Sequence, residues 1–276
     1  MGKVPLKDVE TEPWKDVAVD LAGPWKATVD GKDIVFHTFT IIDTFTGWVE
    51  IIPIRNKEME TVGDAFKREW LRRYPRPGRV IFDAGSEFDN KYFRDLLKIW
   101  FVNDCPITVR NPRANAIVER MHLVLGNMLR CQLAKLYPTE DVVAELTSAA
   151  AFAIRATVHG TTRYTPAQMV FSKDMILRTH MEANTELVRQ RREAAIYKSN
   201  QRENKRRIAY DYKPGDKVLI LVGGYLDPKL ELHHGPYKVI GFNKSNGTLT
   251  IRRKNYTEPI NIRNVRPYFG KKKALK

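Results

Sequence analysis

The sequence has few cysteines, and the two present, Cys105 and Cys131, form no Cys-x-x-Cys motif. This count excludes a disulfide framework and leads us to expect an intracellular protein. The six histidines do not combine with these cysteines at zinc-finger spacing, which excludes a Cys/His zinc module from this sequence. No apolar run approaches the ~18 residues that a membrane span needs. The first residues contain acids and lack an apolar core, so we expect neither a signal peptide nor a transit peptide.

Positive charge is abundant, and it is distributed unevenly. The chain contains 47 Lys+Arg against 32 Asp+Glu, a net charge of +15, with 43% hydrophobic residues that suffice for a buried core. Residues 1–185 carry a net charge of +1, whereas residues 186–276 carry +14. This local excess indicates a polyanionic partner. Because no basic amphipathic helix with a broad apolar face is evident, a nucleic acid is favoured over an acidic membrane.

The first part of the chain has the pattern of an α/β domain. Apolar and β-branched runs predict strands, and apolar residues at helical spacing predict helices. The expected strands are 17–19, 34–42, 48–54 and 79–82, and the expected helices are 58–74, 90–101, 115–134 and 139–159. Residues 43–47 form a turn, so Asp43 is interpreted as a turn acid, and Gly23-Pro24 is expected to end the first strand. Strands followed by alternating helices indicate a mixed sheet.

The second part has a different pattern. Residues 186–212 are rich in charge and lack Gly and Pro, which predicts an exposed helical linker. Short apolar runs at 217–222, 237–242, 248–253 and 259–262 then predict strands, with a hairpin at Asn246-Gly247. Four or five short strands in so short a segment indicate a small β-barrel.

Three acids stand where an α/β sheet places its chemistry. Asp20 and Asp83 each end a predicted strand, and Glu119 lies early on a predicted helix, with 35 residues between it and Asp83. Three carboxylates at such positions can hold two divalent cations ~4 Å apart for phosphoryl transfer. Oxygen ligands with few histidines favour Mg²⁺ or Mn²⁺ over Zn²⁺. Taken one by one, each of these acids is better explained as a surface or turn-capping acid.

The residues around these acids resemble one family. Segments 82–88 and 111–120 are similar to the signatures around the second and third acids of retroviral and LTR-retrotransposon integrases, and Asp20 stands in the Asp-x-x-Gly-Pro setting of the first. The similarity to the gypsy-type members continues in segments 164–168, 170–171, 235–239 and 264–268. Together these motifs cover residues 14–270.

The resemblance implies a fold, a domain order and an activity. The implied fold is a ribonuclease-H-like core with a mixed five-stranded sheet, followed by a small SH3-like barrel. The expected domains are an N-terminal extension 1–13, a catalytic core 14–185, a basic helical linker 186–212, a DNA-binding barrel 213–270 and a basic tail 271–276. The implied activity is metal-dependent joining of element 3′-hydroxyl ends to target DNA, with or without trimming of the ends.

The same resemblance implies site residues and partners. Asp20, Asp83 and Glu119 are the expected ligands of two Mg²⁺ or Mn²⁺ ions. The expected partner is double-stranded DNA, bound by a homo-oligomer in the nucleus with a possible chromatin tether, after release from a polyprotein. Two residues depart from the family pattern, Ala84 where Asn is usual and Ala116 where Gly is usual, and the family's N-terminal zinc domain is absent from this sequence. A co-opted, non-catalytic DNA- or chromatin-binding protein with the same fold is therefore the alternative.

Other polar residues are candidates for DNA contacts. His122 follows Glu119 on one helical face and is either a DNA- or water-facing group or a plain helix-face histidine. Arg113 and Arg120 either contact phosphate or are surface charges, and Asn115 either lines the groove or caps the helix. Cationic clusters in the second part favour phosphate binding. They comprise Arg189, Arg191, Arg192, Lys205, Arg206, Arg207, Lys238, Arg252, Arg253, Lys254, Lys271, Lys272 and Lys273.

Overall fold

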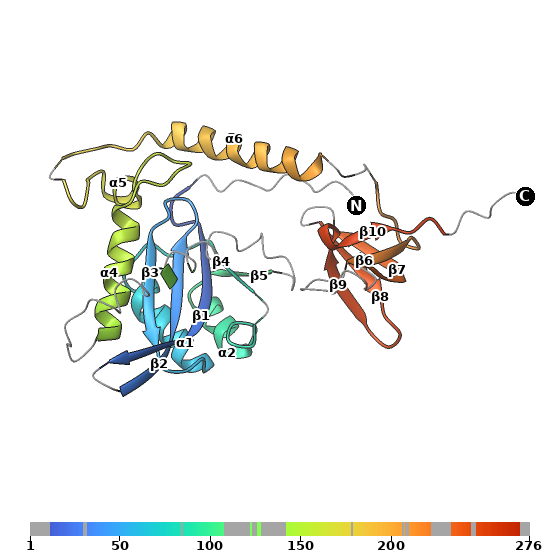
Figure 1. Ribbon diagram of the computed structural model, residues 1–276, viewed down its shortest axis with the longest axis horizontal. Coiled ribbons are helices and arrows are strands. Elements are labelled where there is room, and N and C mark those ends of the chain that lie inside the picture. The colour runs from blue at the N-terminus through green and yellow to red at the C-terminus, as the bar shows by residue number, and fades with distance from the viewer. Residues whose placement is uncertain are drawn as a thin grey trace, which may run out of the picture. The chain divides into compact units, whose positions relative to one another are not determined.

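The chain forms two compact units, whose border falls within one helix, between Arg192 and Glu193 (Figure 1). The computed structural model describes residues 12–29, 32–83, 85–107, 122, 126–127, 142–177, 179–205, 207, 210–221, 233–243 and 247–270. In that part of the chain, no helix combines the length and the apolar character needed to cross a membrane. The first unit contains a mixed α/β sheet and the second an antiparallel sheet.

The sheet of the first unit has the strand order β3-β2-β1-β4-β5. The first three strands are antiparallel neighbours, and β4 and β5 run parallel to β1. Their bounds are Asp16–Val29 for β1, Lys32–Asp43 for β2, Val49–Ile54 for β3, Arg79–Asp83 for β4 and Asn103–Ile107 for β5. The central strand β1 is therefore paired on both sides, and Asp20 lies within it, in the middle of the sheet.

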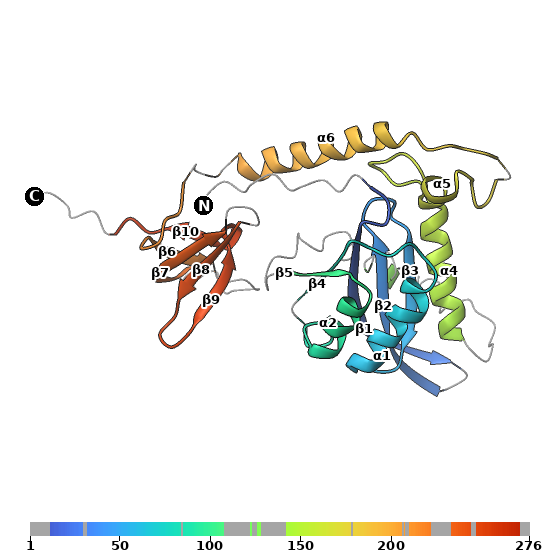
Figure 2. The same ribbon diagram turned by 180° about the vertical axis from the view of Figure 1, so that it is seen from behind.

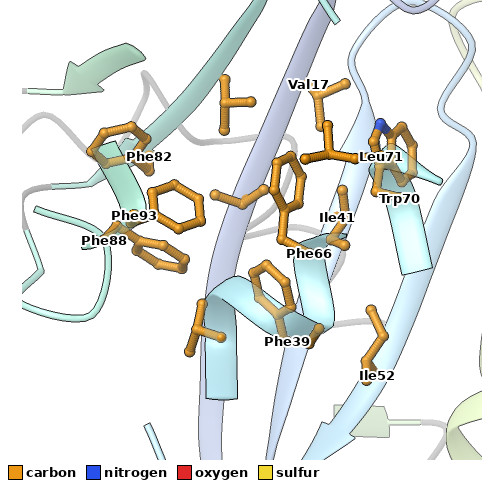
Figure 3. Close-up of a cluster of buried hydrophobic side chains, with 14 of the residues drawn as sticks. Val17, Phe39, Ile41, Ile52, Phe66, Trp70, Leu71, Phe82, Phe88 and Phe93 are labelled. Carbon is orange, nitrogen blue, oxygen red and sulfur yellow. The ribbon is translucent and has the colours of Figure 1, made fainter. Parts of the chain in front are cut away.

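Helices cover both faces of this sheet, as Figures 1 and 2 show. Alternate strand residues face opposite ways, so Val17 and Val19 pack with α1, its π-helical continuation η1 and α2, whereas Ala18 packs with α4. Figure 3 shows the first of these cores, where Phe39, Phe66 and Phe93 meet between sheet and helices. The bounds are Met59–Phe66 for α1, Lys67–Leu71 for η1, Lys91–Ile99 for α2, Val142–Ala156 for α4, Pro166–Phe171 for α5 and Thr185–Asn204 for α6.

The sheet of the second unit has the strand order β10-β6-β7-β8-β9, with every pair antiparallel. It encloses a small core of Val218, Ile220, Val239, Leu249 and Ile251 with neighbouring apolar residues. The bounds are Lys217–Leu221 for β6, His233–Asn243 for β7, Thr248–Arg252 for β8, Thr257–Asn261 for β9 and Val265–Pro267 for β10. The short strands predicted for this region are thus present.

One expectation about strand ends was wrong. The Gly23-Pro24 pair does not end β1, because the strand continues to Val29 across a register shift between Ala22 and Trp25. In that shift two residues of β1 stand opposite one residue of β2, which is a β-bulge that leaves Pro24 outside the hydrogen-bonded ladder. The helix expected over 58–74 is also shorter, ending at Leu71.

Candidate active site and nucleic-acid surface

Asp20 and Asp83 lie on the same face of the sheet, at the same level. The parallel pairing of β1 with β4 aligns Ala18 with Ile81, so two residues further along each strand Asp20 comes level with Asp83. Residues level with one another in neighbouring strands point to the same face, here the face that α4 covers. Because neighbouring strands lie ~4.8 Å apart, the register places Asp83, at the carboxyl end of β4, beside Asp20 of β1. The expectation that Asp20 also ends its strand was wrong, since β1 continues past it to Val29.

The surroundings of Asp20 orient its carboxylate. One oxygen, Oδ1, accepts a hydrogen bond from the backbone N–H of Leu21 at 2.8 Å. The other oxygen, Oδ2, lies 3.7 Å from Nδ1 of His122. The second ring nitrogen of His122, Nε2, is 3.1 Å from the hydroxyl of Thr40, which is the direct cross-strand neighbour of Asp20. Burial lowers the pKa of His122 to about 4, so the imidazole is neutral at pH 7 and its contact with Asp20 is not an ion pair.

The carboxylate of Asp83 is exposed, and the backbone of Gly85 lies close to it. Its Oδ1 accepts from the N–H of Gly85 at 3.2 Å. A Cβ atom at Gly85 would come within 3.0 Å of Asp83 Oδ1 and 2.8 Å of the Glu87 carboxylate. The absence of a side chain at Gly85 therefore lets the turn wrap closely around Asp83. The departure at Ala84 falls outside the described residues.

The third predicted acid, Glu119, lies outside the described residues, as do Arg113, Asn115 and Arg120. Within the described ranges, no three His, Cys, Asp or Glu side chains are grouped closely enough to hold a metal ion. The donor set nevertheless fits Mg²⁺ or Mn²⁺, since Asp20 and Asp83 offer hard carboxylate oxygens from neighbouring strands. His122 is helical in the structure and lies next to Asp20 and Thr40.

The first cationic cluster of α6 is largely engaged within its own unit. Arg192 donates to the carbonyl oxygens of Thr44, at 2.7 Å, and Phe45, and its guanidinium carbon lies 5.3 Å from the Phe45 ring centroid. Arg191 donates to the carbonyl of Thr162 at 2.7 Å. Arg189 is half-exposed and pairs with Glu186 at 3.1 Å. We therefore leave Arg191 and Arg192 out of the proposed DNA surface.

The second unit presents a row of cations across its sheet. The register places Lys217 of β6 beside Lys238 of β7, and Lys238 beside Arg252 of β8. All three side chains are exposed, and their inward-facing neighbours Val218 and Val239 are buried in the core. Like charges opposite one another on adjacent strands destabilise a sheet. A bound polyanion would neutralise the repulsion between these three cations. This face is therefore the candidate nucleic-acid surface.

Neighbouring basic residues of the second unit have internal partners instead. Arg253 donates to Glu258 at 2.8 Å and to the hydroxyl of Tyr237 at 2.7 Å. Arg207 pairs with Glu203 at 3.1 Å, beside a second pair between Glu203 and Arg263 at 2.7 Å. Lys205 and Lys254 are exposed. Arg206 and the tail residues Lys271, Lys272 and Lys273 lie outside the described residues.

Sequence reasoning missed two residues of these sites. Thr40 was overlooked because its place opposite Asp20 depends on the hairpin register, which no local motif reveals. Lys217 could have been found, because the alternation of residues 217–221 already predicts that its side chain faces outward, like that of Leu219. The interpretation of Asp43 as a turn acid is consistent with the structure, where its carboxylate accepts from the backbone N–H of Thr46 at 2.7 Å.

No protein-family model matches the chain. In sequence it is 26% identical over 269 residues to the retrovirus-related Pol polyprotein from transposon 412 of Drosophila melanogaster, covering 87% of this chain and 21% of that polyprotein. It is 30% identical over 96 residues to the Gag-Pol polyprotein of walleye dermal sarcoma virus, covering 34% of this chain and 5% of that polyprotein. The chain thus spans about a fifth or less of the length of these curated relatives.

In structure, the chain is similar to a chain from the cryo-EM structure of the simian T-cell lymphotropic virus intasome in complex with PP2A regulatory subunit B56 gamma. The TM-score is 0.65 at 13% identity, and the superposition covers 99% of this chain and 85% of that chain. This likeness shows a shared fold, and it confirms the predicted fold class. The resemblance to the integrases of retroviruses and LTR retrotransposons is thereby confirmed: the sequence relatives of the chain are Pol polyproteins of such elements, and its fold is that of a retroviral intasome chain.

Proposed function

We propose that the chain is an integrase, a polynucleotidyl transferase that joins the 3′-hydroxyl ends of element DNA to a target phosphodiester, with trimming of those ends as a preceding step. The observation that carries the proposal is the register of β1 and β4, which brings Asp20 level with Asp83 on one face of the sheet. The sequence relationship to Pol polyproteins supports the same reading.

In this proposal Asp20, Asp83 and Glu119 hold two Mg²⁺ or Mn²⁺ ions. Glu119 precedes His122 by three residues, the spacing that puts side chains on one face of a helix, and His122 contacts Asp20. Bound metal ions would activate the attacking hydroxyl and stabilise the leaving oxygen of an in-line displacement. The role of the protein is to hold the three carboxylates on two neighbouring strands and one helix, so that little rearrangement is needed when DNA binds.

In this proposal the second unit binds DNA. The row of Lys217, Lys238 and Arg252 fits the phosphates of a duplex and carries no sequence information by itself. We also propose that several copies assemble on the DNA ends. The protein is released from a polyprotein, acts in the nucleus and uses a chromatin tether. A DNA-binding protein without catalysis is the second candidate, favoured by the same cation row taken alone.

A joining assay separates the two candidates. The chain is incubated with a pre-processed DNA end, a plasmid target and Mg²⁺ or Mn²⁺, and joined products are resolved on a gel. Products that form with metal and disappear with EDTA support the integrase. Duplex binding without product, at any metal and with any DNA end tried, supports the second candidate.

Thr40 is expected to tune the site through His122. Thr40→Val removes the hydroxyl that contacts Nε2 while keeping the shape of a fully buried side chain. We expect strand transfer to fall about 10–100-fold, as for outer residues that orient metal ligands, and the Mg²⁺ concentration for half-maximal activity to rise. Thr38→Val is the matched control, since Thr38 is equally buried on the same strand face and contacts Trp25 instead. Equal losses in both variants would contradict the assignment.

The cation row predicts a change in salt dependence. Replacing Lys217, Lys238 and Arg252 together by alanine should lower the slope of log affinity for duplex DNA against log salt by about 3, at about 0.9 per phosphate contact. Fluorescence anisotropy across a salt series measures this slope. For a matched pair, Arg252→Ala should lower the slope and the adjacent Arg253→Ala should not, because Arg253 is held by Glu258 and Tyr237. Identical slopes for both single variants would remove the row from the DNA surface.

A further inference from the structure

An exposed apolar patch lies at the edge of the first sheet opposite the carboxylates. Asp83 ends β4, whereas the patch lies where β4 and β5 begin, next to the end of α2. The side chain and backbone N–H of Asn103 both donate to the carbonyl of Gly78, at 3.1 and 3.0 Å, which holds the two incoming segments side by side. We define this patch, the Phe101 patch, as Arg76, Lys98, Ile99 and Phe101.

Its apolar members are unusually exposed. Ile99 is 72% exposed and Phe101 is 81% exposed, whereas Leu97 and Val102 beside them are buried in the core. The contrast shows that Leu97 and Val102 already pack the end of α2 against the core. Two large apolar side chains remain in water for no reason that the core supplies, which is the pattern of a surface that binds another molecule.

The backbone at Phe101 strengthens this reading. The N–H of Phe101 donates to the carbonyl of Lys98 at 3.0 Å, and that of Val102 to Leu97 at 2.9 Å. These two bonds form a Schellman motif, whose left-handed residue is usually glycine. Phe101 occupies that position with φ +54°, a conformation that is costly for a bulky side chain. A residue that strains the backbone and gains no burial indicates a function outside folding.

The rim of the patch is cationic. The guanidinium carbon of Arg76 lies 5.8 Å from the centroid of the Phe101 ring. Arg76 is exposed, and its guanidinium makes no ion pair with any residue in the described ranges. Lys98 is also exposed, and its ammonium forms a long ion pair, at 3.9 Å, with the carboxylate of Asp95 one turn earlier on α2. An apolar centre beside the exposed cations Arg76 and Lys98 is complementary to a partner that has apolar side chains and negative charge.

We propose that the Phe101 patch binds an acidic peptide segment of a partner protein, with an apolar side chain against Ile99 and Phe101 and carboxylates at Arg76 and Lys98. A two-fold contact with a second copy is disfavoured, because it would set the cationic rims of the two copies against each other. A nucleic acid is disfavoured because a branched aliphatic side chain such as Ile99 offers bases no stacking surface. The proposal does not depend on the carboxylates being catalytic.

A random-peptide library displayed on phage tests the proposed peptide binding. Phages are selected on the full chain and counter-selected on Phe101→Gly. Glycine suits the left-handed position, so this variant should raise the urea midpoint of unfolding while removing the ring. We expect enriched peptides that combine acidic and apolar residues. In anisotropy, a selected peptide should lose about tenfold or more in affinity for Phe101→Gly and for Arg76→Glu, as anchors at the centre of an interface do. Arg55→Glu, an exposed site elsewhere in the same unit, is the control and should bind normally.

Four results would overturn the proposal. The first is no enrichment, or enrichment of basic or neutral peptides. The second is a selected peptide that binds Phe101→Gly as tightly as the parent chain. The third is duplex DNA whose affinity falls severalfold in Phe101→Gly, which would make the patch a nucleic-acid contact. The fourth is self-association of the parent chain in sedimentation that Phe101→Gly abolishes, which would assign the patch to a second copy.

Discussion

Replacing Asp83 by asparagine should abolish DNA strand transfer while leaving the fold intact. Asparagine has nearly the same shape as aspartate, and Asp83 is exposed at the end of β4, so the substitution leaves the packing of the sheet unchanged. It removes the negative charge that a divalent cation requires at this position. We expect a loss well above the about 10–100-fold seen for outer residues of metal sites.

Two further variants test whether the loss is specific to the carboxylate site. Asp104→Asn removes an exposed acid from the neighbouring strand β5, outside the carboxylate site, and should leave joining unchanged. Glu119→Gln should match Asp83→Asn if both carboxylates hold the same metal pair. Duplex affinity, measured beside activity, should stay constant in all three variants, because the proposed DNA surface lies in the second unit. Joining by Asp83→Asn at the parent rate would eliminate the carboxylate site.

Part of the placement of the two acids could be predicted from the sequence. Runs of apolar residues locate β1 and β4, and Asp83 ends β4 as expected, whereas β1 continues past Asp20 to Val29. Whether two such acids face the same side depends on register. Here both follow their paired residues Ala18 and Ile81 by two positions, a fact available only from the pairing in space.

Gly-Pro pairs show where local signals misled the prediction. Both Gly23-Pro24 and Gly235-Pro236 predict a break, yet β1 and β7 run through them. In each case the pair stands opposite a single residue of the partner strand, and the glycine has positive φ, +116° and +135°. A bulge tolerates a residue that cannot donate to the ladder. Because tertiary pairing decides between a bulge and a chain break, the dipeptide alone could not.

Cationic residues show a second limit of prediction from sequence, the orientation of individual side chains. Arg252 and Arg253 are adjacent and chemically identical, but one faces outward in the cation row and the other is held by Glu258 and Tyr237. Arg192 likewise caps carbonyl oxygens of the turn after β2. A run of like charges predicts a polyanionic partner for the segment, while the orientation of each side chain depends on neighbours that are distant in the sequence.

Asp43 should be the acid whose removal destabilises the first unit most. It is fully buried, and its carboxylate accepts from the N–H of Trp14 at 2.9 Å and from the N–H and hydroxyl of Thr46 at 2.7 and 2.5 Å. Asp43→Ala leaves these donors unpaired and removes the charge that faces Arg192. We expect the free energy of unfolding to fall by about 3–5 kcal/mol, because each buried donor left without a partner costs about 1–3 kcal/mol. Urea unfolding measures it, with the exposed Asp104→Ala as the control.

The pH dependence of this cluster separates charge pairing from packing. Burial raises the pKa of Asp43 above the ordinary value of 3.8, and the charge of Arg192 opposes that rise. Folding therefore disfavours the ionised carboxyl, and this group costs stability as the pH rises from 3.8 through its pKa in the folded chain. Arg192→Met should raise that pKa further, so its destabilising effect should grow over the same pH range. In an Asp43→Ala background, the change in unfolding free energy caused by Arg192→Met should not vary with pH. A pH dependence that persists in this background would mean that Arg192 stabilises the unit through another titrating group.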